Sequence, residues 1–161
     1  GIPNAYEGAK ALANGEVTRA HYARYLVQIG KVSNDGQAFK RYLGGGKSCF
    51  VKAEWVDIPT AIETIHAAGG VAVIAHPMRY NMTGKWIRRL IVDFKQWGGD
   101  GMEVADSGQT KDQRQYLARL ANEYDLAASL GSDFHFPCGW IELGKNLFLP
   151  EEVKPIWTLF E

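Results

Sequence analysis

Residues 71–77 read Val-Ala-Val-Ile-Ala-His-Pro, so that five apolar residues stand directly before a histidine. A short, continuous apolar run with β-branched side chains is typical of a strand that is buried on both faces. The run follows Gly69-Gly70, where a helical pattern ends. This stretch therefore predicts a buried strand over residues 71–75 that delivers His76 to the end of a sheet.

The same succession of helix and strand occurs further along the chain. Residues 101–105 (Gly-Met-Glu-Val-Ala) and 126–130 predict two more strands, and the predicted helices cover residues 57–68, 83–97 and 110–124. Strands that alternate with helices in this way predict right-handed βαβ crossovers and a parallel sheet. No GxGxxG or GxxxxGK[ST] motif follows a predicted strand, so neither a Rossmann nor a P-loop phosphate-binding turn is indicated.

The first fifty residues differ from the rest because they contain helical patterns and no strand pattern. Predicted helices cover residues 4–13, 18–29 and 35–43, and Gly44-Gly45-Gly46 ends the last of them. We therefore predict two domains, a small all-helical lobe over residues 1–50 and an α/β region over residues 51–161. Three parallel strands are too few for a closed βα barrel, which needs about eight.

Composition narrows the class of protein. The chain has 161 residues, 46% of them hydrophobic and 12% aromatic, which is enough for a sizeable core and excludes global disorder. The formal net charge of 0 argues against a uniformly basic nucleic-acid coat protein. No apolar run is long enough to span a membrane, and no signal peptide opens the chain. Cys49 and Cys138 form no CxxC motif, so we expect a reducing, cytoplasmic location without disulfides.

The neutral total conceals an uneven distribution of charge. Residues 1–52 contain eight basic and three acidic side chains, a net charge of +5, and the remainder carries −5. A basic lobe joined to an acidic one indicates an anionic ligand. Solvated lysines on small helices explain the same count without any ligand.

Three side chains predict a metal site. His76 follows the first predicted strand, and Asp133 and His135 follow the third. The carboxyl ends of parallel strands meet at one edge of a sheet, and the Asp-x-His spacing points both side chains to one side of an extended segment. A buried core histidine and a capping aspartate are the structural alternatives. Nitrogen and carboxylate donors without thiolate suit Mn, Fe or Zn. Glu103 and Asp106 lie within and after the second strand.

Other side chains are candidates for binding an anionic substrate. Thr18 begins a predicted helix whose free N–H groups favour an anion. Arg79, on the loop after His76, is suited to clamp a phosphate, and ordinary helix capping with solvated arginines is the alternative reading. The substrate-binding candidates, which share a place near that helix, the glycine-rich turn or the loop, are Thr18, Arg19, Arg24, Lys47, Arg79 and Tyr80.

Several motifs together resemble one family. They are Ile74-Ala75-His76-Pro77 with Arg79-Tyr80-Asn81, residues 131–135 (Gly-Ser-Asp-Phe-His), 18–24 (Thr-Arg-Ala-His-Tyr-Ala-Arg), 101–105 and 137–144 (Pro-Cys-Gly-Trp-Ile-Glu-Leu-Gly). The chain resembles the C-terminal half of PHP-domain (polymerase and histidinol phosphatase) phosphoesterases. It is most similar to the RNase AM branch, which contains 3′,5′-nucleoside bisphosphate phosphatases and 5′→3′ exoribonucleases.

The resemblance implies a fold and an activity. It implies a distorted βα barrel, of which the chain supplies about three parallel βα units, with residues 1–50 as an inserted helical cap. It also implies hydrolysis of phosphate esters in 3′,5′-nucleoside bisphosphates or short 5′-phosphorylated RNA, with up to three divalent ions, Mn or alternatively Fe or Zn. His76, Asp133 and His135 would be metal ligands and act in catalysis through the metal. Tyr22 or Tyr25 would stack on a base.

The chain departs from the family because the N-terminal half, with its His-x-His motif, is missing. The chain begins at Gly1 without an initiator Met, and we expect it to be part of a larger protein. Alone, it is expected to bind metal weakly and to be inactive until joined to that half. The alternatives are a non-catalytic nucleotide- or RNA-binding module and a metal-dependent amidohydrolase-like enzyme.

Overall fold

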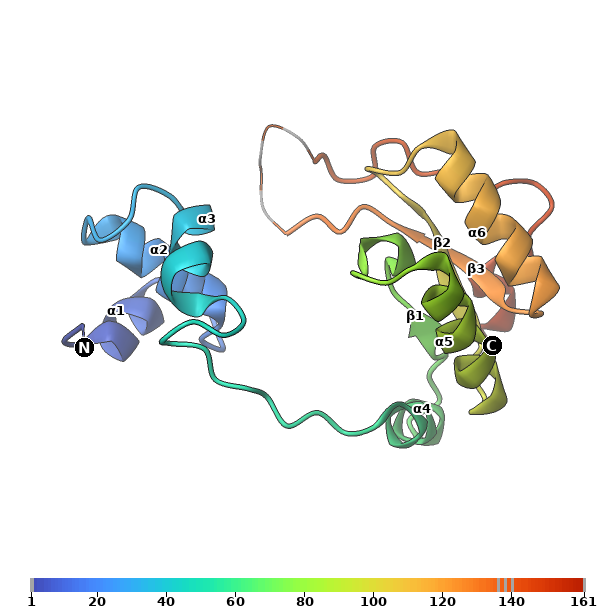
Figure 1. The fold of residues 1–161 in the computed structure, drawn as a ribbon, viewed down its shortest axis with the longest axis horizontal. Helices are drawn as coiled ribbons and strands as arrows, with labels where there is room; N and C mark the ends of the chain where they lie inside the picture. Colours follow the sequence, from blue (N-terminus) through green and yellow to red (C-terminus); the bar gives the residue numbers. More distant parts are fainter. Residues whose placement is uncertain (1, 136, 138, 140, 161) are drawn as a thin grey trace. The chain divides into compact units, whose positions relative to one another are not determined.

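The computed structural model describes residues 2–135, 137, 139 and 141–160, which form two compact units, Gly1–Trp55 and Val56–Glu161 (Figure 1). The boundary lies five residues after the predicted one, since residues 51–55 follow the helical unit without regular secondary structure. The roles of cap and half-barrel stay predictions. Cys138 and Trp140 of the 137–144 motif lie outside the described residues.

The first unit is helical, as expected. It contains α1 (Ala5–Ala11), α2 (Arg19–Gln28), α3 (Asp35–Ala38) and the π-helical segment η1 (Phe39–Leu43). The helix predicted over residues 35–43 is therefore an α-helical turn that continues into a π-helical one. Its small core consists of Ala23, Leu26, Val32, Ala38 and Leu43.

One close approach holds α1 against α2. A Cβ atom on Gly8 would lie 2.1 Å from Cε2 of Tyr25, a distance that no real pair of carbon atoms adopts. Glycine is therefore required at position 8 for the ring of Tyr25 to pack on α1. This contact places Tyr25 beside the cavity described below.

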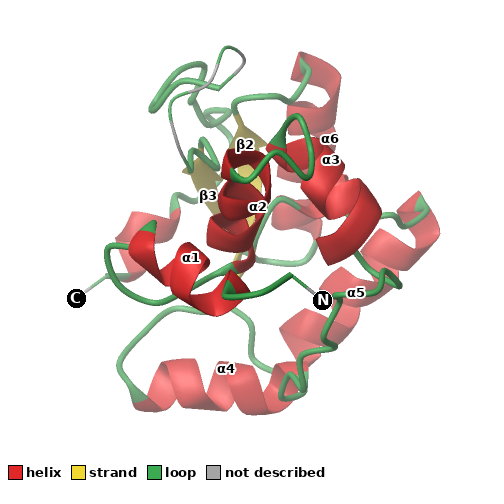
Figure 2. Cartoon of the chain, turned by 90° about the vertical axis from the view of Figure 1, so that its left-hand side faces the viewer, coloured by secondary structure: helices red, strands yellow, loops and turns green. Residues whose placement is uncertain are grey.

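The second unit is an α/β structure with a parallel sheet, and this prediction is confirmed. In the described part of the unit, the strands pair in the order β1 (Val73–Ile74), β2 (Gly101–Asp106) and β3 (Ala127–Gly131). The helical elements between and after them are α4 (Ile58–Ala67), the 3-10 turn η2 (Pro77–Arg79), α5 (Gly84–Gln96), α6 (Lys111–Glu123) and the 3-10 turn η3 (Ile156–Leu159). Figure 2 shows the strands in yellow and the helices in red.

Two helices begin at the capping residues that their sequences indicate. Asp57 Oδ1 accepts from the N–H of Thr60 at 2.9 Å and so caps α4. At the start of α6, the Gln113 N–H donates to Thr110 Oγ1 at 3.2 Å, while the Thr110 N–H donates to Gln113 Oε1 at 2.9 Å. This reciprocal pair satisfies two N–H groups that the helix leaves free. It also fixes the end of the short loop that follows β2.

The two faces of the sheet differ in chemistry. One face packs against α4, α5 and α6 in a single core that contains Ala72, Ile74, Met102, Val104, Leu126, Ala128, Ile62, Ile91 and Leu117. Because side chains alternate along a strand, the register places Val73, Glu103 and Ser129 on the opposite face. β1 is shorter than predicted and is not buried on both faces, since Val73 is half-buried and Ala75 is exposed at this edge of the sheet.

β2 departs from a regular register beside Glu103. Glu103 pairs with Ser129 and Ala105 pairs with Leu130, so Val104 is an extra residue in β2. Such a bulge shifts the alternation of side chains by one residue. In a regular strand, Glu103 and Asp106 would lie on opposite faces. The bulge allows both side chains to lie on the same face near the carboxyl end of the sheet.

Among the described residues, no helix combines the length and the apolar character that crossing a bilayer requires.

Candidate functional site

His76 lies two residues after the end of β1 and has an unusual backbone conformation. Its φ of 33° lies in the left-handed region, and Pro77 begins the turn η2 directly after it. The N–H of His76 donates to Glu103 Oε2 at 2.5 Å, a short bond to a carboxylate. The backbone at the end of β1 is thus attached to a side chain of β2.

The imidazole of His76 has an unsatisfied nitrogen. Its Nδ1 is buried and has no hydrogen-bond partner in the part of the chain that is described. The ring of Tyr80 meets the imidazole edge to face, with 5.8 Å between the ring centroids. A buried polar atom without a partner is unfavourable and calls for an explanation. A divalent cation that prefers imidazole nitrogen fits this atom.

Glu103 is the most enclosed carboxylate of this region after Asp106. Only 8% of the residue is exposed, and a Cβ atom on Gly131 would come within 2.7 Å of Glu103 Oε1. Glycine at the end of β3 therefore makes room for this carboxylate. Burial raises the pKa of Glu103, and the charges of Asp106 and Asp133 add to the rise, while the bond from the His76 N–H opposes it. Burial is the largest cause, because it disfavours the charged form of the carboxyl.

Arg79 connects two of those carboxylates. Its Nε donates to Asp106 Oδ2 at 3.1 Å, and its Nη1 forms an ion pair with Asp133 Oδ2. These bonds, with Asp106 as the largest cause, raise the pKa of Arg79. The predicted phosphate clamp therefore lies at the ends of the strands, where its charge is satisfied by protein carboxylates.

Asp133 and His135 are in contact, but Asp133 has a left-handed φ of 54° and not the extended backbone on which the prediction from their spacing rested. The Nδ1–H of His135 donates to the carbonyl oxygen of Asp133 at 2.8 Å, and Nδ1 lies 3.8 Å from Asp133 Oδ1. The donation through Nδ1 leaves Nε2 with a free lone pair, as is usual for metal-binding histidines. The His135 side chain is 72% exposed.

His76, Asp133 and His135 do not form one compact group. Among the described residues, no three His, Cys, Asp or Glu side chains are arranged to hold a single ion. The connection from His76 to the end of β3 runs through Glu103, which accepts the His76 N–H and lies against Gly131. Glu103 and Asp106 had no predicted role. A sequence signal for Glu103 exists, because it is the one charged residue within an apolar strand. The position of Asp106 depends on the bulge, which the sequence does not reveal.

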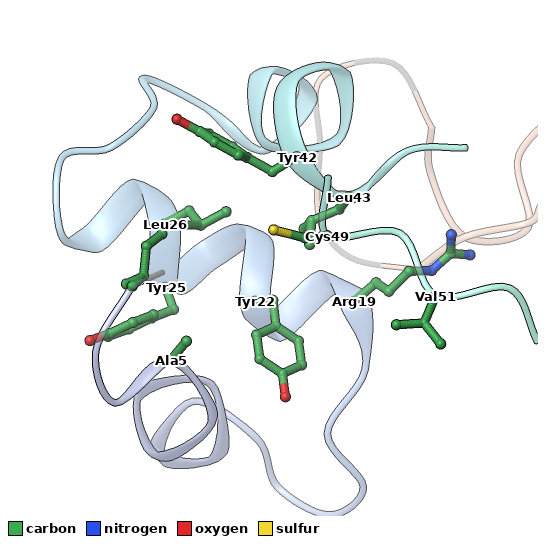
Figure 3. A pocket seen from close by; sticks show the side chains of 10 residues that line it. Ala5, Arg19, Tyr22, Tyr25, Leu26, Tyr42, Leu43, Cys49 and Val51 are labelled. Atoms are coloured by element: carbon green, nitrogen blue, oxygen red, sulfur yellow. The ribbon is translucent and has the colours of Figure 1, made fainter. Parts of the chain in front are cut away.

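The first unit contains a cavity of about 410 Å³ (Figure 3). Its lining is mostly apolar and aromatic and consists of Ile2, Ala5, Arg19, Tyr22, Tyr25, Leu26, Tyr42, Leu43, Cys49 and Val51. The Arg19 guanidinium lies beside Val51 at the edge of this group (Figure 3). Of the predicted substrate-binding residues, only Arg19 lines the cavity, together with the predicted stacking residues Tyr22 and Tyr25.

At the predicted anion site, Thr18 is in contact with a neighbouring histidine. The Thr18 N–H donates to Nδ1 of His21 at 3.0 Å, and Thr18 Oγ1 lies 3.0 Å from the same nitrogen. His21 therefore caps α2 from within its own first turn. Arg24 is exposed on α2, and Lys47 is exposed after the glycine-rich turn.

No protein-family model matches the chain. Curated proteins do match it. A 5′-3′ exoribonuclease from Haemophilus influenzae is 82% identical over 160 residues, which are 99% of this chain and 58% of that protein. A 5′-3′ exoribonuclease from Escherichia coli is 51% identical over 99% of this chain and 55% of its own length. A 3′,5′-nucleoside bisphosphate phosphatase from Chromobacterium violaceum is 40% identical over 100% of this chain and 58% of its own length.

Two solved structures share the fold. An amidohydrolase from Chromobacterium violaceum, with bound sulfate and no metal, superposes with a TM-score of 0.84 at 39% identity and covers 98% of this chain and 56% of its own. A protein from Bifidobacterium adolescentis proposed to be a metal-dependent phosphoesterase has a TM-score of 0.77 at 26% identity and covers 99% and 58%. The chain spans little more than half the length of the curated relatives it matches. It is homologous along nearly its whole length to these exoribonucleases and bisphosphate phosphatases, and the resemblance that its motifs indicate is confirmed.

Proposed function

We propose that the chain belongs to a metal-dependent phosphoesterase that hydrolyses phosphate esters of nucleotides, with 3′,5′-nucleoside bisphosphates or short 5′-phosphorylated RNA as substrates. The proposal rests on the group of side chains at the carboxyl end of the sheet. There a buried histidine nitrogen that has no partner among the described residues meets three carboxylates and an arginine. The names of the relatives point to the same chemistry.

The side chains of this region fit divalent cations. His76 and His135 each offer a ring nitrogen with a free lone pair, and Asp133 offers carboxylate oxygen. This donor set suits Mn, with Fe or Zn as alternatives. We assign His76, Asp133 and His135 as ligands of up to three such ions. When bound, the ions supply Lewis-acid activation of water near neutral pH and neutralise phosphoryl oxygens.

Arg79 has the geometry of a phosphoryl-binding group. Its planar guanidinium donates in a fork that matches a phosphate. Asp133 would be shared between Arg79 and a bound cation, and Arg79 Nη1 would then be available to bind a substrate oxygen. Burial, and less strongly the charge of Glu103, raises the pKa of Tyr80. Its phenol therefore stays protonated at neutral pH, beside the imidazole of His76.

We propose that the basic first unit contributes anion-binding side chains. Thr18, Arg19, Arg24 and Lys47 belong to this unit, whose residues up to position 52 carry a net charge of +5. Three tyrosines line the cavity beside Arg19, and two of them, Tyr22 and Tyr25, are the predicted stacking residues; stacking of a base on an aromatic ring is worth about 1–3 kcal/mol.

The fold supports a partial barrel of PHP type. The helices cover one face of the sheet, and the other face carries Glu103 and Ser129, as the interior of a barrel would. We propose that additional chain, as in the longer relatives, completes the barrel and the metal ligands. The chain alone then binds metal weakly and has no activity. Atomic absorption that finds near-stoichiometric Mn, Fe or Zn on the purified chain at micromolar free metal overturns this part.

The direct test uses the intact protein, meaning the chain with any further length that its gene encodes. We expect it to release phosphate from a nucleoside 3′,5′-bisphosphate with Mn²⁺ and to stop in EDTA. Nucleotide binding that survives EDTA without turnover would instead identify a binding module. The amidohydrolase among the structural neighbours favours a second candidate, which hydrolysis of a C–N bond without phosphate release would establish.

A further inference from the structure

Asp106, at the end of β2, has every polar group occupied. Its Oδ1 accepts from the Gly108 N–H at 2.6 Å, and its Oδ2 accepts from Arg79 Nε at 3.1 Å. Its N–H donates to Gln109 Oε1 at 3.0 Å, and its carbonyl oxygen accepts from Arg114 Nη2 at 3.2 Å. The residue is 2% exposed. A carboxylate held at this many points has one fixed orientation.

Arg114 holds the backbone carbonyl of Asp106 in place. It is 4% exposed, and its guanidinium lies 3.9 Å from the centre of the Phe148 ring. Nη2 also donates to the carbonyl oxygen of Asn146 at 3.0 Å. The carbonyl of Asp106 is thus bonded to an arginine that packing and a second bond already hold in place.

Arg79 receives its orientation from this carboxylate. Its Nε points at a buried oxygen, whereas its other bond, from Nη1, goes to Asp133, the proposed metal ligand. The Arg79 side chain is 37% exposed, compared with 3% for Asp106. Because the guanidinium is planar, fixing Nε fixes the plane in which Nη1 and Nη2 lie.

We propose that Asp106 is a positioning residue that holds Arg79 by Nε, so that the Nη groups exchange Asp133 for the oxygens of a bound phosphoryl group. This inference rests on the proposed function. Asp106 touches neither the metal nor the substrate, and it acts only through Arg79. A merely structural role would instead weaken phosphate binding whatever residue stands at position 79.

A double-mutant cycle separates these two roles. The intact protein is titrated calorimetrically with inorganic phosphate in the presence of Mn²⁺. D106N keeps the shape and the acceptor for Gly108 but turns an amide towards Arg79, so we expect the Kd to rise about tenfold. In an R79Q background, the same change is expected to alter the Kd by less than about twofold. D112N, at an exposed carboxylate on α6, is the matched control and leaves the Kd unchanged.

Each other outcome has a definite meaning. An equal loss of affinity in both backgrounds, or no loss in either, overturns the inference, and so does a wild-type protein that does not bind phosphate. If D106N fails to fold, D106E replaces it in both backgrounds, because glutamate keeps the charge but displaces the oxygens that face Arg79 Nε. A rise in Kd that shrinks in the R79Q background then supports the inference, and an equal rise in both backgrounds overturns it. A coupled cycle in a protein that does not hydrolyse bisphosphates keeps Asp106 as a positioning residue and rejects the proposed function.

Discussion

The N–H of His76 donates to Glu103 Oε2 at 2.5 Å and thereby joins the end of β1 to the interior of β2. The bond occurs where the backbone of His76 adopts a left-handed φ of 33°, a conformation unfavourable for residues other than glycine. Glu103 offsets part of that cost and sets the direction in which the imidazole leaves the strand. The orientation of the proposed metal ligand therefore depends on a carboxylate from the neighbouring strand.

The elevated pKa of Glu103 predicts a pH-dependent effect on stability. Since the pKa of this buried carboxyl is higher in the folded than in the unfolded protein, its favourable contribution is complete below the unfolded value, about 4.3, and is lost as the pH rises through the folded value. E103Q is neutral and escapes that loss. In EDTA, urea unfolding should show the free energy of unfolding of E103Q improving relative to wild type as the pH rises. A difference that does not change with pH contradicts this explanation.

We expect position 131 to be sensitive to substitution, because Glu103 occupies the space beside Gly131. In G131A, the new methyl group meets Glu103 Oε1 at 2.7 Å and must push the carboxylate away from His76. We expect a loss of about 1–3 kcal/mol in the free energy of unfolding, measured by urea denaturation, together with weaker Mn²⁺ binding. G45A is the control, because a Cβ there has no atom within 4 Å. Equal stability of the two variants would show that Glu103 is not confined by β3.

Among these variants, we expect a substitution of Asp133 to have the largest effect on activity. D133N removes a metal ligand while keeping the side-chain shape, and asparagine tolerates the residue's left-handed φ of 54°. Loss of even an outer-sphere partner of a metal costs about 10–100-fold, so we expect kcat for phosphate release to fall at least about 100-fold. D125N is the matched control, since Asp125 also has a positive φ of 50° but a fully solvated side chain. Wild-type turnover by D133N would remove Asp133 from the site.

The Arg79–Asp133 ion pair predicts opposite effects on two ligands. In R79Q, Asp133 loses its competitor, so Mn²⁺ binding in the absence of substrate should tighten by about three- to tenfold. Phosphate binding should weaken, because the guanidinium fork is lost. Calorimetric titration of each ligand measures both changes. R89Q, which breaks an exposed pair with Asp93 on α5, should change neither. Weaker binding of both ligands to R79Q would mean that Arg79 supports the metal site instead of competing with it.

The order and type of the elements followed from local patterns. Continuous apolar runs and capping residues such as Asp57 and Thr110 predicted the strands and helices of the second unit. The length of β1 did not follow, because the apolar pattern of residues 71–75 does not reveal how many of them pair within this sheet. The π-helical turn at Phe39–Leu43 was also missed, since its apolar spacing resembles that of an α-helix.

The sequence indicated candidate residues for the site but not the contacts between them. His76, Asp133 and His135 follow predicted strands in the sequence, and their role as metal ligands stays a prediction. The partners of Arg79 are 27 and 54 residues away along the chain, and no sequence pattern indicates such pairs. The bulge at Val104 follows from the register with β3, so the part played by Asp106 became visible only in the folded structure.

Anomalous diffraction from crystals of the intact protein soaked in Mn²⁺ tests the central claim most directly. We expect manganese peaks near the carboxyl ends of β1 and β3. Ring nitrogens of His76 and His135 and carboxylate oxygens of Asp133 should lie at bonding distances of about 2.0–2.3 Å from them. Peaks bound only by other residues, or no peaks where these side chains lie, would contradict it.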